Sequence, residues 1–204
     1  DHKKSILLNS FVEYVRSLLG MIQENFTYES VFRYLRSGYC EFTEDEIDRL
    51  ENYCLALGIK GYKKWQQAWA RKTKEADEEE VEKLNHLRVK FVEKIDPLMY
   101  VSRQKKKTVL DITLAVYEFI AGEHLQEKLE QQQKFFAEQG ELTLAKEYEQ
   151  IYRIVMELFD KFSELLGDEP ITLKEYCELL DAGFEEAKVG VIPPSIDQVV
   201  IGSC

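Results

Sequence analysis

The chain changes its pattern near its end. Apolar residues recur at helical spacing over almost all of 1–190, whereas Ile196, Val199, Val200 and Ile201 follow a Pro-Pro break in a β-branched run typical of a strand. A lone strand leaves its backbone donors and acceptors unpaired unless a sheet receives it. No other stretch predicts a partner strand. We therefore expect a helical domain over 1–190, and over 191–204 the truncated start of a strand that belongs to a neighbouring sheet.

Helical periodicity and end signals divide the helical region. The predicted helices cover 9–25, 27–38, 43–58, a stretch from the acidic run 75–80 to near Pro97, 109–140, 142–166 and 172–184. Thr43, Thr108 and Thr172 each stand three residues before an acidic residue and predict capped helix starts. No repeat of 20–50 residues is found, which disfavours a solenoid. The predicted fold is all-α, an irregular helical bundle with a short C-terminal strand.

The charge and the cysteines limit the classes of function. A formal net charge of −11 argues against indiscriminate binding to nucleic acid or to anionic membranes, but it does not exclude local basic patches. No apolar run approaches the roughly 18–20 residues that span a bilayer. The four cysteines, Cys40, Cys54, Cys177 and Cys204, lack a C-x-x-C spacing, which favours reduced thiols in a cytosolic protein over disulfides or a metal cluster.

Motifs for catalysis are not found in the sequence. There is no G-x-x-x-x-G-K-[ST] phosphate loop and no G-x-S-x-G nucleophile elbow. His2, His86 and His124 are far apart and stand in no zinc-binding spacing. The acidic run 78–80 is typical of a solvated helix start. We therefore expect no catalytic, metal-binding or cofactor-binding residue in this chain.

Two segments carry a concentration of cations. In the predicted loop 60–74 both tryptophans alternate with lysine and arginine, and a second basic cluster occupies 103–107. Cations offset phosphate charge and flat rings stack on bases, so both segments are candidates for DNA contact. The alternative is that the tryptophans pin the loop onto the helices, and that 103–107 is a plain surface turn. The candidate contact residues are Lys60, Lys63, Lys64, Trp65, Trp69, Arg71, Lys72, Arg103, Lys105, Lys106 and Lys107.

Three segments in order carry a resemblance to a known family. Residues 25–38 read Asn-Phe-Thr-Tyr-Glu-Ser-Val-Phe-Arg-Tyr-Leu-Arg-Ser-Gly, residues 50–61 read Leu-Glu-Asn-Tyr-Cys-Leu-Ala-Leu-Gly-Ile-Lys-Gly, and residues 191–203 read Val-Ile-Pro-Pro-Ser-Ile-Asp-Gln-Val-Val-Ile-Gly-Ser. Together they resemble the B subunit of the bacterial AddAB-type (RexAB-type) ATP-dependent helicase–nuclease. The intervening region 62–170 resembles it only as generic helix.

The resemblance implies that the chain is an internal fragment of a longer subunit. In that family a helicase-like protein without a motor role is joined to a nuclease domain, and 198–203 resembles the run-up to the fifth helicase motif. The helical part would then be similar to the 2B insertion subdomain of a superfamily 1 helicase. ATP, magnesium and an iron–sulfur cluster are expected only for the intact subunit or complex, because the residues that bind them in the family have no counterparts here.

The resemblance also implies a biological role. It points to DNA unwinding and end resection in the bacterial cytoplasm, during repair of double-strand breaks by homologous recombination that a hotspot sequence regulates. The implied partners are DNA and the A subunit, with no membrane. This domain is expected to contact DNA or the partner without catalysis of its own. The alternative is a freestanding helical interaction or scaffold domain, which fits the net charge of −11.

Overall fold

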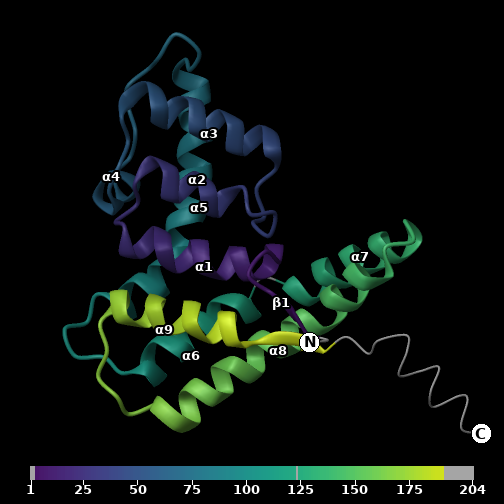
Figure 1. Ribbon diagram of the computed structural model, residues 1–204. Helices are drawn as coiled ribbons and strands as arrows, with labels where there is room; N and C mark the ends of the chain where they lie inside the picture. Colours follow the sequence, from purple (N-terminus) through teal and green to yellow (C-terminus); the bar gives the residue numbers. More distant parts are fainter. Residues whose placement is uncertain (1–2, 123, 191–204) are drawn as a thin grey trace, which may run out of the picture.

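The computed structural model describes residues 3–122 and 124–190, and these form a mainly helical molecule (Figure 1). The elements are β1 (Lys3–Ser5), α1 (Ser10–Gln23), α2 (Tyr28–Leu35), α3 (Glu44–Leu57), α4 (Tyr62–Gln66), α5 (Glu78–Ser102), α6 (Val109–Ala121), α7 (Leu125–Glu138), α8 (Leu142–Leu166), α9 (Leu173–Glu186) and β2 (Lys188–Gly190). The predicted all-α class is confirmed. The strand predicted over 191–204 lies outside the described residues, and the domain boundary at 190 stays a prediction.

Helix α1 lies at the centre of the fold (Figure 1). It packs against α2 on one side and against α8 and α9 on the other. Phe11, Val15, Leu18 and Met21 recur at helical spacing on its buried face and are fully covered. Helix α5 connects the same two sides, since it packs against α3 and α4 and also against α6. The buried side chains of both sides therefore form one continuous core.

Helix α7 and the first half of α8 form an antiparallel hairpin that projects from the body (Figure 1). Polar contacts fix its base. The Tyr39 hydroxyl donates to Gln132 Oε1 at 2.7 Å, and Lys128 Nζ donates to the Tyr39 carbonyl at 2.8 Å. Asn9, which caps α1, donates from Nδ2 to Glu147 Oε2 at 3.0 Å. The hairpin is thus joined to the body through hydrogen bonds that are buried or partly buried.

The helix ends that depend on local caps are confirmed. At α3 the Glu46 backbone N–H donates to Thr43 Oγ1 at 3.1 Å, and the Thr43 backbone N–H donates to Glu46 Oε1 at 2.9 Å. The same reciprocal pair opens α6 at Thr108 and α9 at Thr172. Gly58 ends α3 in the left-handed conformation, with φ of 64°, which a side chain disfavours.

The prediction of one helix over 109–140 is wrong. Helix α6 ends at Ala121, and α7 begins at Leu125 after His124, whose φ is 53°. Apolar residues keep helical spacing on either side of the break, and the spacing slips by only one residue across it, from Ile120 to Leu125, so the prediction ran through the break. The break lets α7 leave the line of α6 and pack against α8.

Four other elements also differ from the prediction. The predicted loop 60–74 contains α4, and α5 continues past Pro97 to Ser102. The prediction that no other stretch forms a strand is wrong, because β1 and β2 pair in antiparallel register with Lys3 opposite Gly190. Strands of three residues are too short to show an alternating pattern in the sequence.

Candidate nucleic-acid interface

The segment 60–74 runs beside α5 in the opposite direction. The Tyr62 hydroxyl donates to Asp96 Oδ1 at 3.0 Å, near the end of α5. Closer to the start of α5, the Trp69 backbone N–H donates to Asn85 Oδ1 at 2.9 Å, and Asn85 Nδ2 donates to the Trp69 carbonyl at 2.7 Å. Asp96 and Asn85 lie about 16 Å apart along the helix, from a rise of about 1.5 Å per residue. The cations of this segment are therefore spread along α5.

Both candidate tryptophans belong to the core. Trp65 is 1% exposed and Trp69 is 7% exposed. The Trp65 ring centroid lies 4.6 Å from that of Phe91 on α5, and the Trp69 centroid lies 5.2 Å from that of Tyr53 on α3. With their rings packed between α3 and α5, neither tryptophan can stack on a base. We therefore remove both from the candidate contact, and the pinning role is the one that the structure supports.

Arg88 holds these tryptophans in place, and the sequence pattern did not single it out. Its side chain is buried, NH1 donates to the Trp65 carbonyl at 2.7 Å, and Nε donates to Asn85 Oδ1 at 2.9 Å. The guanidinium also lies over the Trp69 ring, 5.9 Å from its centroid. Burial lowers the pKa of Arg88 because desolvation disfavours the charged form. This cation acts inside the fold rather than toward a ligand.

The structure brings the first part of the basic loop to the second basic cluster. The central carbon of the Arg103 guanidinium lies 4.9 Å from the Tyr62 ring centroid, so the end of α5 meets the start of α4. Burial and the hydrogen bond to Asp96 both raise the pKa of the Tyr62 hydroxyl, which therefore stays protonated. We call the exposed cations around this contact the basic end of α5: Lys60, Lys63, Lys64, Arg103, Lys105 and Lys106.

Lys107 has a different role in the same turn. Its Nζ donates to the Gln104 carbonyl at 2.8 Å, just beyond the end of α5. The negative end of the helix dipole stabilises a cation at this position. Lys107 is only partly exposed, whereas Lys105 and Lys106 are exposed. Of the lysines in this turn, Lys105 and Lys106 are therefore the better placed for an external ligand.

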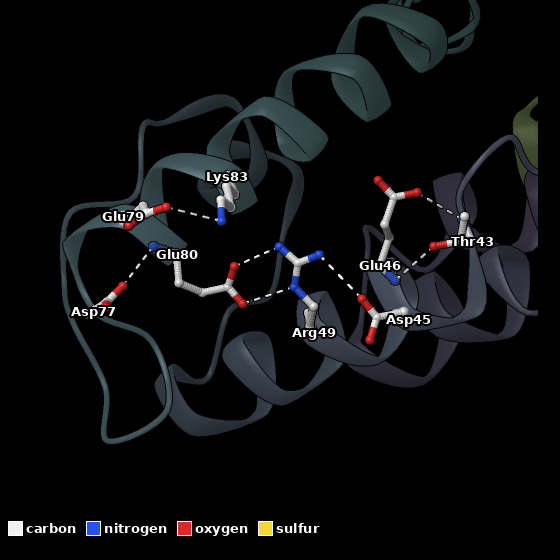
Figure 2. A network of polar contacts seen from close by, with 8 residues as sticks. All are labelled: Thr43, Asp45, Glu46, Arg49, Asp77, Glu79, Glu80 and Lys83. Carbon is white, nitrogen blue, oxygen red and sulfur yellow. Dashed lines mark hydrogen bonds and ion pairs between the residues drawn. The ribbon is translucent and has the colours of Figure 1, made fainter.

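The opposite end of α5 is acidic (Figure 2). Arg49 on α3 forms a two-point ion pair with Glu80, with Nε to Oε2 at 2.9 Å and NH2 to Oε1 at 2.6 Å. This hydrogen-bonded pair lowers the pKa of Glu80 below its ordinary value. Glu79 pairs with Lys83 at 3.2 Å, and Asp77 caps the helix. The carboxylates outnumber the cations in this network, which makes it unfavourable for a phosphate backbone.

Arg71 and Lys72 lie toward this acidic end. The Arg71 carbonyl accepts a hydrogen bond of 2.7 Å from the Tyr53 hydroxyl on α3. The chain then turns at Thr73, whose backbone N–H donates to the Ala76 carbonyl at 2.9 Å. Both cations are exposed. The structure thus separates them from the basic end, although the sequence places all of them in one loop.

Other chemistry is limited in the part of the chain that the structure describes. Within residues 3–122 and 124–190, no three His, Cys, Asp or Glu side chains lie close enough to hold a metal ion together. Burial raises the pKa of the Cys54 thiol to about 12 and that of Cys177 to about 11, so both thiols stay protonated near neutral pH. None of the described helices is both long and apolar enough for a membrane crossing.

Comparison with known proteins identifies relatives over the whole chain. No protein-family model matches it. It is 45% identical over 205 residues to the B subunit of the ATP-dependent helicase/deoxyribonuclease of Lachnoclostridium phytofermentans, an alignment that covers 99% of the chain. It is 38% identical over 219 residues to the protein of the same name from Alkaliphilus metalliredigens, and 38% identical over 202 residues to that of Clostridium novyi, covering 100% and 98% of the chain.

The aligned region is a minor part of each relative. It spans 18% of the Lachnoclostridium protein, 19% of the Alkaliphilus protein and 17% of the Clostridium novyi protein. The identity nevertheless extends through 62–170, where the sequence alone had shown only generic helix. The chain is therefore related over its full length to one part of the B subunits of ATP-dependent helicase/deoxyribonucleases, as the resemblance predicted.

Proposed function

We propose that this chain is the DNA-contacting helical domain of a helicase–nuclease subunit, and that DNA meets it at the basic end of α5. The single observation that carries the proposal is the contact between Arg103 and Tyr62, which joins two basic segments into one exposed surface. The whole chain has a net charge of −11 even with these cations included, so a phosphate backbone would meet less repulsion at this local surface than over the chain on average. The contact is to phosphate and carries no base specificity.

The proposal for the whole protein follows from its relatives. Their names describe an ATP-dependent helicase and deoxyribonuclease. Accordingly, the longer protein unwinds and resects DNA ends for recombinational repair of double-strand breaks in the bacterial cytoplasm. ATP, magnesium and an iron–sulfur cluster belong to this proposal for the intact complex, and we assign no residue of this chain to them.

A second contact in the proposal is with protein. The relatives are named as B subunits, which implies a partner subunit. The α7–α8 hairpin projects from the body (Figure 1), and Phe135 and Leu142 near its turn are 56% and 67% exposed. Exposed apolar side chains on a projecting hairpin favour a protein contact over a nucleic-acid contact. This observation supports an interaction role like that of a scaffold domain, alongside DNA binding rather than instead of it.

The DNA contact is tested by the salt dependence of duplex binding. A variant with Lys60→Gln, Lys63→Gln and Lys64→Gln is compared with a control that carries Arg71→Gln, Lys72→Gln and Lys74→Gln. Both variants lose the same charge, and the replaced side chains are all exposed. The first variant should bind more weakly, with a salt slope smaller by roughly 3, since each lost phosphate contact removes about 0.9. The control should bind like the parent chain.

Two results would contradict this function. Equal losses in the two triple variants would show that net charge matters and position does not. Absence of any DNA affinity at low salt would remove DNA contact from the role of this domain, and leave the protein contact.

A further inference from the structure

A groove lies between the last part of α5 and α6, next to the basic end. Its volume is about 660 Å³, within the roughly 300–1,000 Å³ that is typical of small-molecule sites. Much of its lining is apolar, contributed by Pro97, Leu98, Leu114, Ala115 and Phe119. An apolar groove of this size can accept a flat ring such as a nucleobase.

Tyr100 supplies an accessible aromatic ring at this groove. It lines the groove and is 71% exposed, and Leu114 on α6 is 49% exposed. The tryptophans of segment 60–74 are buried, so Tyr100 offers what they cannot, a ring that an incoming base can reach. Base–aromatic stacking does not depend on sequence, because every base has a π face.

The groove carries positive charge where α5 turns into α6. Lys106 and Lys107 line this part of it. Asp111 also lines it, but its carboxylate accepts the Thr108 backbone N–H at 2.9 Å and is engaged in the cap of α6. Farther along the two helices the groove is lined by Glu93 and Glu118 and by one cation, Lys94, whose Nζ lies over the Phe119 ring at 5.3 Å, so carboxylates outnumber cations there. A phosphate is therefore favoured at the turn and disfavoured at the far part of the groove.

Tyr100 also adjoins the proposed phosphate contact. It lies on α5 three residues before Arg103, the C-cap of that helix, and residues three apart are neighbours on a helix surface. Arg103 in turn lies over Tyr62, the first residue of α4. A strand whose backbone follows the basic end would thus bring its next base to the mouth of the groove.

We infer that this groove binds an unpaired nucleotide of single-stranded DNA, with the base stacked on Tyr100 and the adjacent phosphate at Lys106. The inference rests on the proposed function and specifies which form of DNA this part of the surface binds. A base inside a duplex is already stacked and paired, so it cannot enter the groove. The surface as a whole then distinguishes a duplex that has a single-stranded end from a blunt duplex.

The test measures binding of a short oligothymidine and of a blunt duplex at low salt, by fluorescence anisotropy. Tyr100→Ala should weaken oligothymidine binding about tenfold, from the loss of one stacked base, and should leave duplex binding unchanged. Tyr100→Phe keeps the ring and should bind like the parent. Tyr117→Ala is the matched control, because Tyr117 is a 47% exposed tyrosine on α6 that does not line the groove. Stacking is read independently as quenching of one 2-aminopurine placed in the oligothymidine.

The possible outcomes separate the groove site from the duplex contact. A selective loss in Tyr100→Ala, together with loss of quenching, supports the groove site. Equal oligothymidine affinity for Tyr100→Ala and Tyr117→Ala overturns it, as does an equal loss toward single strand and duplex. In those cases the lysine variants still decide separately whether the basic end binds the duplex. If the parent chain binds neither DNA, both the groove site and the proposed function fail.

Discussion

The guanidinium of Arg103 lies over the ring of Tyr62, with its central carbon 4.9 Å from the ring centroid. Arg103 follows the last residue of α5, and Tyr62 is the first residue of α4. The contact therefore brings together two stretches that are far apart in the sequence. The Tyr62 hydroxyl is fixed by Asp96, one further contact to α5. The Tyr62 ring thus positions the Arg103 guanidinium, which would otherwise extend into solvent beyond the end of α5.

Two replacements of Tyr62 distinguish the contribution of its ring from that of its hydroxyl. Tyr62→Phe should lower the free energy of unfolding by about 1 kcal/mol, because one hydrogen bond is lost, and should leave DNA affinity unchanged because the ring remains under Arg103. Tyr62→Leu should cost about 2 kcal/mol and should also weaken DNA binding. Urea unfolding and fluorescence anisotropy measure the two effects. Equal DNA affinities for the two variants would show that the ring does not position Arg103.

The Arg49–Glu80 pair predicts a pH-dependent contribution to stability. Its side chains are 29% and 24% exposed, so it is partly shielded from solvent. Glu80→Gln should lower the free energy of unfolding at pH 7 by about 0.5–1 kcal/mol. Because the pKa of Glu80 is depressed in the folded state, the stabilisation is present above the ordinary value of 4.5 and is lost as the pH falls through the folded value.

The measurement for Glu80 is urea unfolding at pH 7 and near pH 3. Parent and Glu80→Gln should differ at pH 7 and converge in acid. Glu79→Gln is the control, since the Glu79 side chain is 76% exposed and its pair with Lys83 should contribute less. A difference that persists unchanged at low pH would assign the effect of Glu80→Gln to something other than its charge.

Gly183 on α9 packs closely against side chains of α8. A Cβ atom there would lie 2.9 Å from Leu158 Cδ1 and 2.9 Å from Phe162 Cζ. Gly183→Ala should therefore destabilise the protein by about 1–3 kcal/mol, even though alanine favours a helix. Gly20 inside α1 is the matched control because a Cβ there meets nothing within 4 Å. Gly20→Ala should stabilise by about 0.5–1 kcal/mol, and thermal unfolding would show shifts of opposite sign.

Features set by neighbouring residues were predictable from the sequence. Thr43 with Glu46, and the equivalent caps at Thr108 and Thr172, form within one helical turn and appear as predicted. The break before Leu125 was missed, because the apolar spacing is helical on both sides of it and slips by only one residue between Ile120 and Leu125. It arises from the packing of α7 on α8, which involves residues distant in the sequence.

In the candidate site, too, the features set by neighbouring residues were predictable and those set by packing were not. The sequence located the cations but could not assign Trp65 and Trp69 to stacking or to the core. Their burial depends on Phe91 and Arg88, which lie on α5 and are distant from them in the sequence. The separation of Arg71 from Arg103 likewise depends on how the segment 60–74 packs beside α5, which the sequence does not show. Tyr100 carried no sequence signal, because its importance comes from a groove between two helices.

The most direct test of DNA contact at the basic end locates DNA on α5 by crosslinking. A photoreactive benzoyl-phenylalanine is placed either at Lys64, in the basic end, or at Lys72, toward the acidic end, and the protein is irradiated with a labelled duplex that has a single-stranded end. Both positions are exposed and lie in one segment, so they differ mainly in their place along α5. We expect crosslinks from position 64 and few from position 72. Equal crosslinking from both positions, or more from position 72, would contradict DNA contact at the basic end.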